Sequence, residues 1–171
     1  GDEAHRSAVQ SFWQSPTICT KPGLKAVDLF EACADGQIKA LWVISTNPAV
    51  SLPDADGVAA AIANVPFVVT SDIMEKTDTN ALADVLLPAT GWGEKDGTVT
   101  NTNRQVQLGR AALPLPGEAK PDWWIIQEIA NRFGLGWRYQ HPQDVFAEMQ
   151  QGMHSFNHIS WERLARENSV T

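Results

Sequence analysis

Polar side chains suited to ligand binding follow three apolar runs of this sequence, ALWVI (40–44), PFVVT (66–70) and VLLP (85–88). Short hydroxyl and amide groups offer hydrogen-bond donors and acceptors close to the backbone. A carboxylate can accept two adjacent N–H donors from a guanine edge, and a lysine amine suits a pyrophosphate or a ring carbonyl. These groups together predict a nucleotide site. The candidate residues are Thr46, Asn47, Ser71, Asp72, Lys95 and, at the start of a later helical segment, Asp122.

Each candidate also has a structural interpretation. Asn47 precedes a proline and is typical of a turn, and Asp72 could cap the segment that follows it. Lys95 lies between two acidic residues, as in a solvated surface triplet, and Asp122 is placed to cap a helix. The ligand interpretation therefore depends on the combined spacing of these residues rather than on any one of them.

The predicted elements bring these residues to one edge. Continuous apolar runs are typical of parallel strands covered on both faces, and strands are predicted over 40–44, 66–70 and 84–87. Helical spacing predicts helices over 24–35 and 58–64, the latter capped by Asp54 or Asp56, and one from Asp122 to Gly134. This alternation predicts a doubly wound, mainly parallel α/β sheet flanked by helices, Rossmann-like, with a β-hairpin excursion near 98–108. In such sheets ligands bind beyond the carboxyl ends of the strands.

The chain length predicts a single α/β domain over residues 1–171. Residues 1–22 have weak periodicity and are expected to form an extended lead-in. Residues 135–171 are expected to form a peripheral helical tail, with helical pieces over 143–150 and 161–168.

Composition excludes several function classes. Thirteen Lys and Arg face twenty Asp and Glu, and the net charge of −7 argues against a nucleic-acid surface. No apolar run approaches the length of a membrane span, and the first residues lack the pattern of a secretory signal. Two cysteines without a CxxC spacing fit a reduced, cytoplasmic setting.

The sequence has no GxSxG, Walker or GxGxxG motif and no convincing metal-ligand pattern, so we predict neither catalytic residues nor a metal site.

Longer segments carry a family resemblance: PGLKAVDLFEACADGQIKALWVISTNPAVSLPDAD, PFVVTSDIMEKTDTNALADVLLPATGWGEKDGTVTNTNRQ and PGEAKPDWW. They resemble the molybdopterin oxidoreductase superfamily, and most closely the catalytic subunit of bacterial assimilatory nitrate reductases. Enzymes of that family hold molybdenum between two molybdopterin guanine dinucleotides. The resemblance implies an interior α/β domain of a longer enzyme, which binds the guanosine end of one dinucleotide.

The resemblance assigns the cofactor contacts residue by residue. Asn47 matches the asparagine of the first loop, Ser71 and Asp72 match the pair after the second strand, Lys95 matches the lysine of an EK-acid-G turn, and Asp122 matches the aspartate that opens the next helix. The remaining domains of the parent chain are implied as partners, and an electron-donor protein or domain is a further candidate. The family's 4Fe-4S cluster is implied to lie in a part of the enzyme outside this sequence.

Two alternatives stay open at this stage. The parent enzyme could be a formate dehydrogenase or another molybdopterin oxidoreductase, because residues outside this sequence decide the substrate. The domain could also be a scaffold or interaction module with no ligand. Lys95 and Asp72 on opposite faces would favour the scaffold.

Overall fold

The computed structural model describes residues 2–171. The chain forms two compact units. The first, here called the sheet unit, comprises Lys25–Gly97 and Gly109–Arg138. The second, here called the hairpin unit, comprises the residues up to Leu24 together with Thr98–Leu108 and Tyr139–Thr171.

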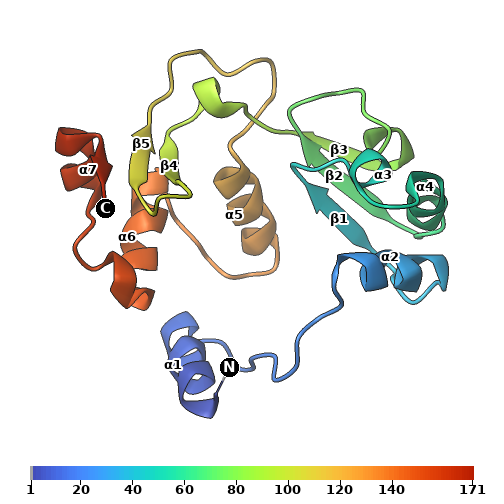
Figure 1. Cartoon of the computed structure of the whole chain (residues 1–171), viewed down its shortest axis with the longest axis horizontal. Helices are drawn as coiled ribbons and strands as arrows, with labels where there is room; N and C mark the ends of the chain where they lie inside the picture. Colours follow the sequence, from blue (N-terminus) through green and yellow to red (C-terminus); the bar gives the residue numbers. More distant parts are fainter. Residues whose placement is uncertain (1) are drawn as a thin grey trace. The chain divides into compact units, whose positions relative to one another are not determined.

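The sheet unit contains a three-stranded parallel sheet in which β2 (Val68–Asp72) lies between β1 (Leu41–Ile44) and β3 (Val85–Pro88) (Figure 1). Ser71 pairs with Ile44 on one side and with Leu87 on the other, so the three carboxyl ends lie level. The predicted mixed α/β fold with a parallel sheet is confirmed.

Helices cover this sheet and supply its core. α2 (Ala26–Ala34) and α4 (Ala55–Ala63) pack together over β1 and β2, with Cys33, Ile62 and Val68 at the centre of the buried cluster. Asp54 caps α4 as predicted, because its carboxylate accepts a hydrogen bond from the Gly57 amide. α3 (Pro48–Ser51) is a single turn after β1, and α5 (Asp122–Arg132) follows later in the chain.

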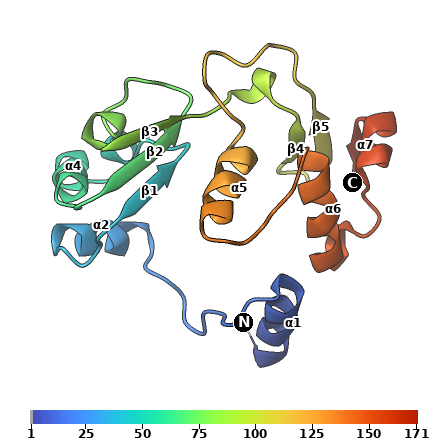
Figure 2. The ribbon, with the colours of Figure 1, turned by 180° about the vertical axis from the view of Figure 1, so that it is seen from behind.

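The hairpin unit is built from helices and short antiparallel strands. β4 (Gly97–Thr100), β5 (Val106–Gly109) and β6 (Ser169–Val170) form its sheet in that order, and β5 pairs antiparallel with β6. Both views show β4 and β5 side by side (Figures 1 and 2). α1 (Glu3–Trp13), α6 (Pro142–Gly152) and α7 (Trp161–Glu167) complete it. Leu164, Phe146 and Val106 lie in its core.

Three sequence predictions need correction. The chain forms two units rather than one domain, and of the predicted peripheral tail 135–171 the part Tyr139–Thr171 belongs to the hairpin unit, to which it contributes β6 and core residues. The segment 1–22 is not all extended, because Asp2 accepts a hydrogen bond from the His5 amide and starts α1. Asp122 does not cap its helix: Pro121 occupies the cap position, and Asp122 is the first helical residue.

Candidate functional site

A cavity of about 470 Å³ lies at the carboxyl ends of the three parallel strands. Each strand contributes the residues that follow it: the loop after β1, the loop after β2, and the segment from Thr90 to Lys95 after β3. Its lining residues are Ser45, Thr46, Asn47, Asp72, Ile73, Met74, Thr77, Thr90, Gly91, Trp92 and Lys95. We call it the strand-end cavity.

The loop after β1 is held firmly in place. The Ser45 amide donates to the Ser71 carbonyl (2.8 Å), and Ser45 has a φ of 55°. Positive φ in a residue other than glycine is uncommon and is enriched at functional sites. Asn47 Oδ1 accepts hydrogen bonds from the Thr79 hydroxyl (2.6 Å) and amide (3.3 Å). The acceptor end of Asn47 is thus engaged within the protein, and its amide nitrogen donates to none of the residues 2–171. Thr46 is exposed in the cavity wall.

The two candidates after β2 have different environments. Asp72 lines the cavity, and its Oδ1 accepts a hydrogen bond from the Met74 amide (3.0 Å). Its Oδ2 accepts nothing from the part of the chain that the structure describes, and it remains available to a ligand. Ser71 is only 2% exposed, and its hydroxyl accepts a hydrogen bond from Trp42 Nε1 (2.9 Å). Ser71 therefore joins β1 to β2 rather than forming part of the cavity wall.

Lys95 and Asp122 form an ion pair, with Nζ 2.7 Å from Oδ2, and both side chains are about a quarter exposed. Lys95 lines the cavity, and Asp122 reaches it only through Lys95. The other oxygen of Asp122, Oδ1, is buried and has no hydrogen-bond partner among the described residues.

Glu94 and Asp96 shape the turn that presents Lys95. Glu94 Oε2 accepts from the Gly91 amide (2.7 Å), and Asp96 Oδ1 accepts from the Ala111 amide (2.8 Å). Because both carboxylates are engaged with backbone amides, they restrain the backbone on either side of Lys95.

Two residues of the cavity wall that matter chemically, Thr90 and Trp92, were not among the candidates predicted from the sequence. Thr90 is 1% exposed, and its Oγ has no hydrogen-bond partner within residues 2–171. Trp92 is 76% exposed and offers an aromatic face. The sequence position of Thr90 could have marked it as a candidate, because it is the first hydroxyl residue after the proline that ends β3.

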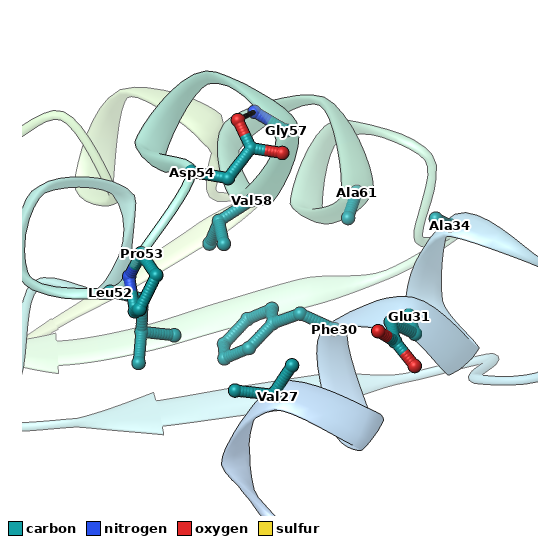
Figure 3. Close-up of a pocket in the computed structure, with 10 residues that line it drawn as sticks. All are labelled: Val27, Phe30, Glu31, Ala34, Leu52, Pro53, Asp54, Gly57, Val58 and Ala61. Atoms are coloured by element: carbon teal, nitrogen blue, oxygen red, sulfur yellow. Dashed lines mark hydrogen bonds between the residues drawn. The ribbon is translucent and has the colours of Figure 1, made fainter.

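A second cavity, of about 330 Å³, is chemically unlike the first. It lies between α2, α4 and the loop before α4, where Phe30 is surrounded by Val27, Leu52 and Val58 (Figure 3). Its two charged lining residues, Glu31 and Asp54, are both acidic, and Asp54 already caps α4. This cavity suits an apolar group better than an anionic one.

Neither the pKa of the buried cysteine nor the grouping of possible metal ligands indicates a reactive centre outside the strand-end cavity. Burial raises the pKa of the Cys33 thiol, which keeps it protonated and unreactive near neutral pH. Within residues 2–171, no three His, Cys, Asp or Glu side chains are grouped so as to hold a metal ion. None of the helices in that range is long and apolar enough to cross a bilayer.

A parallel sheet with polar residues gathered at its carboxyl ends belongs to the class of α/β folds that bind ligands at that edge. The family profile described as "Molybdopterin oxidoreductase" matches residues 6–132, and the chain belongs to this family.

Relatives within the family have different activities. A nitrate reductase of Klebsiella oxytoca is 47% identical over 139 residues, covering 80% of this chain and 16% of that protein. A putative formate dehydrogenase of Bacillus subtilis is 44% identical over 149 residues, covering 87% of this chain and 15% of that protein. This chain therefore spans about a sixth of the length of these relatives.

A solved structure supports the fold. Acetylene hydratase from Pelobacter acetylenicus superposes with a TM-score of 0.65 at 22% identity, over 85% of this chain and 20% of that chain.

Proposed function

We propose that this chain is the part of a molybdenum-dependent nitrate reductase that binds the guanosine end of a molybdopterin guanine dinucleotide. The observation that carries the proposal is the strand-end cavity, where Thr46, Asn47, Asp72 and Lys95 meet. Asp72 and Lys95 line the same cavity, and this common location favours a ligand site over a scaffold.

The chemistry of this cavity fits a guanine nucleotide. Asp72 Oδ2 is the acceptor for the adjacent N–H donors of the guanine edge. Lys95 and the amide nitrogen of Asn47 are donors for phosphate, ribose or carbonyl oxygens. Asp122 holds Lys95 in place, and Ser71 supports the strand end through Trp42. We therefore assign Asp122 and Ser71 to positioning rather than to direct contact.

The bound cofactor would supply the redox chemistry, which is the two-electron reduction of nitrate to nitrite in the parent enzyme. The residues of this chain bind and orient its nucleotide end, and they take no part in making or breaking bonds. The 4Fe-4S cluster and the contacts to an electron donor belong to other parts of the parent enzyme. Both cysteine thiols are free, which fits the reducing cytoplasm expected for nitrate assimilation.

Formate oxidation by the parent enzyme is the second candidate. It is favoured by the Bacillus subtilis relative, which is 44% identical to this chain and is described as a putative formate dehydrogenase. The nucleotide site proposed here is the same in both cases.

Calorimetric titration of the chain with GDP and ADP tests the proposal. We expect GDP to bind and Asp72→Asn to weaken GDP binding about tenfold or more, because the variant places the NH₂ group of a side-chain amide, itself a donor, against the N–H donors of guanine. Asn keeps an oxygen for the Met74 amide. Asp56→Asn, on the exposed first turn of α4, is the matched control and should bind like the wild type. Equal affinity for GDP and ADP, or no binding at millimolar GDP, would contradict the proposal.

A further inference from the structure

Thr90 has a buried hydroxyl group for which the protein provides no partner. The residue is 1% exposed, it lines the strand-end cavity, and its Oγ makes no hydrogen bond to any described residue. A buried hydroxyl without a partner is unfavourable, so native structures seldom retain one without a reason. A ligand in the cavity would provide the missing partner.

The backbone just before Thr90 is fixed by two hydrogen bonds. The Ala89 amide donates to the Asp72 carbonyl (2.9 Å), and the Pro88 carbonyl accepts from the Lys120 amide (3.0 Å). These bonds hold the chain that leads into Thr90 beside the end of β2. Thr90 and Asp72 line the same cavity.

We propose that the Thr90 hydroxyl directly contacts the nucleotide in this cavity, where it donates a hydrogen bond to a ligand oxygen. The inference rests on the proposed function and adds a residue to it. The neighbouring groups agree with an oxygen-rich ligand, because Lys95 and the Asn47 amide nitrogen are also donors in this cavity. Thr90 lies two residues beyond the end of β3, and Asp72 is the last residue of β2.

Thr70 provides a matched control inside the same sheet. It is also 1% exposed, and its Oγ likewise has no partner within the described range. Thr70 lies within β2, however, and is not one of the residues that line the strand-end cavity. The two threonines share burial and an unpaired hydroxyl and differ in access to the ligand.

The test compares Thr90→Val, Thr70→Val and Thr90→Ser in the same chain, by GDP titration and by thermal unfolding without ligand. Both valine variants should unfold at the wild-type temperature or above, because each removes an unpaired buried hydroxyl. Only Thr90→Val should weaken GDP binding, by about tenfold. Thr90→Ser keeps the hydroxyl, and its affinity for GDP should stay within about threefold of the wild type.

Each other outcome has a definite meaning. Wild-type GDP affinity in Thr90→Val would overturn the inference and leave the proposed function intact. A lower unfolding temperature for Thr90→Val than for Thr70→Val would also overturn it, since the hydroxyl would then have a structural role. Failure of the wild type to bind GDP would reject the proposed function and the inference together.

Discussion

The two units of this chain differ in whether their polar side chains have hydrogen-bond partners. In the hairpin unit polar groups pair with one another: the Tyr139 hydroxyl donates to Glu148 (2.5 Å), and Arg163 binds Glu167 (3.0 Å). In the sheet unit several buried polar groups have no hydrogen-bond partner within the described part of the chain. Among residues 2–171, the three buried side-chain oxygens without a partner, on Thr70, Thr90 and Asp122, all belong to the sheet unit.

Of these three groups, the one that we propose to be reserved for a ligand is the Thr90 hydroxyl, because Thr70 and Asp122 do not line the strand-end cavity. A satisfied hydrogen bond stabilises its own unit modestly, whereas an unsatisfied buried group lowers the stability of the free protein. In the sheet unit this cost applies to Thr70, Thr90 and Asp122, of which Thr90 lines the strand-end cavity and Asp122 pairs with Lys95 in the cavity wall. We interpret the hairpin unit as structural and the sheet unit as the site of binding.

The largest expected effect concerns the independence of the two units. Leu164→Ala in the hairpin unit and Ile62→Ala in the sheet unit each remove a fully buried side chain. Each should lower the free energy of unfolding by about 2–5 kcal/mol. Hydrogen exchange should show the loss of protection confined to the mutated unit. A uniform loss across both units in either variant would show one cooperative domain and break the comparison.

Thr79→Val should have the next largest effect, and it lies within the sheet unit. Thr79 is fully buried, its hydroxyl donates to Asn47 Oδ1, and it accepts from the Ala49 amide (3.2 Å). Its loss leaves the Ala49 amide unpaired and leaves Asn47 Oδ1 with only the longer bond from the Thr79 amide (3.3 Å), which should lower stability by about 1–3 kcal/mol in chemical denaturation. GDP binding should weaken as well, because the first loop is no longer fixed.

The control for Thr79→Val is Thr100→Val at an exposed position of β4. It should change stability by less than about 0.5 kcal/mol. A Thr79→Val variant as stable as this control would mean that the bonds to Asn47 do not hold the loop.

The smallest expected effect tests the paired polar groups of the hairpin unit. Burial, with a further contribution from Glu148, raises the pKa of Tyr139 from about 10 to about 12. The folded state therefore holds the phenolic proton more tightly than the unfolded state. This contribution to stability is complete below pH 10 and is lost as the pH rises toward 12.

Tyr139→Phe should lower stability by about 0.5–1.5 kcal/mol near neutral pH and remove that pH dependence. Tyr139 is the only tyrosine of the chain, so phenolate absorbance follows it directly. A midpoint near pH 10 in the folded chain would contradict the assigned pairing.

The strands of the sheet unit could be predicted from the sequence because apolar runs, proline and aspartate mark them. The same runs placed Asn47, Asp72 and Lys95 after successive strands, and the structure gathers them at one cavity. That they bind a cofactor stays a prediction.

The contacts that sequence reasoning missed depend on tertiary packing. Thr79 bonds to Asn47 across 32 residues, and Ser71 to Trp42 across 29. No local pattern encodes such pairs. The unpaired Thr90 hydroxyl is equally invisible in the sequence, because only the packed structure shows its burial and its missing partner.

The central claim is that the strand-end cavity of the sheet unit binds a guanine nucleotide. Titration with GDP, followed by amide chemical shifts, tests it most directly. We predict saturable shifts at Asp72, Thr90 and Lys95 and unchanged positions at Leu164 and Val170 of the hairpin unit. Absence of shifts at the strand ends up to millimolar GDP, or shifts confined to the hairpin unit, would contradict the claim.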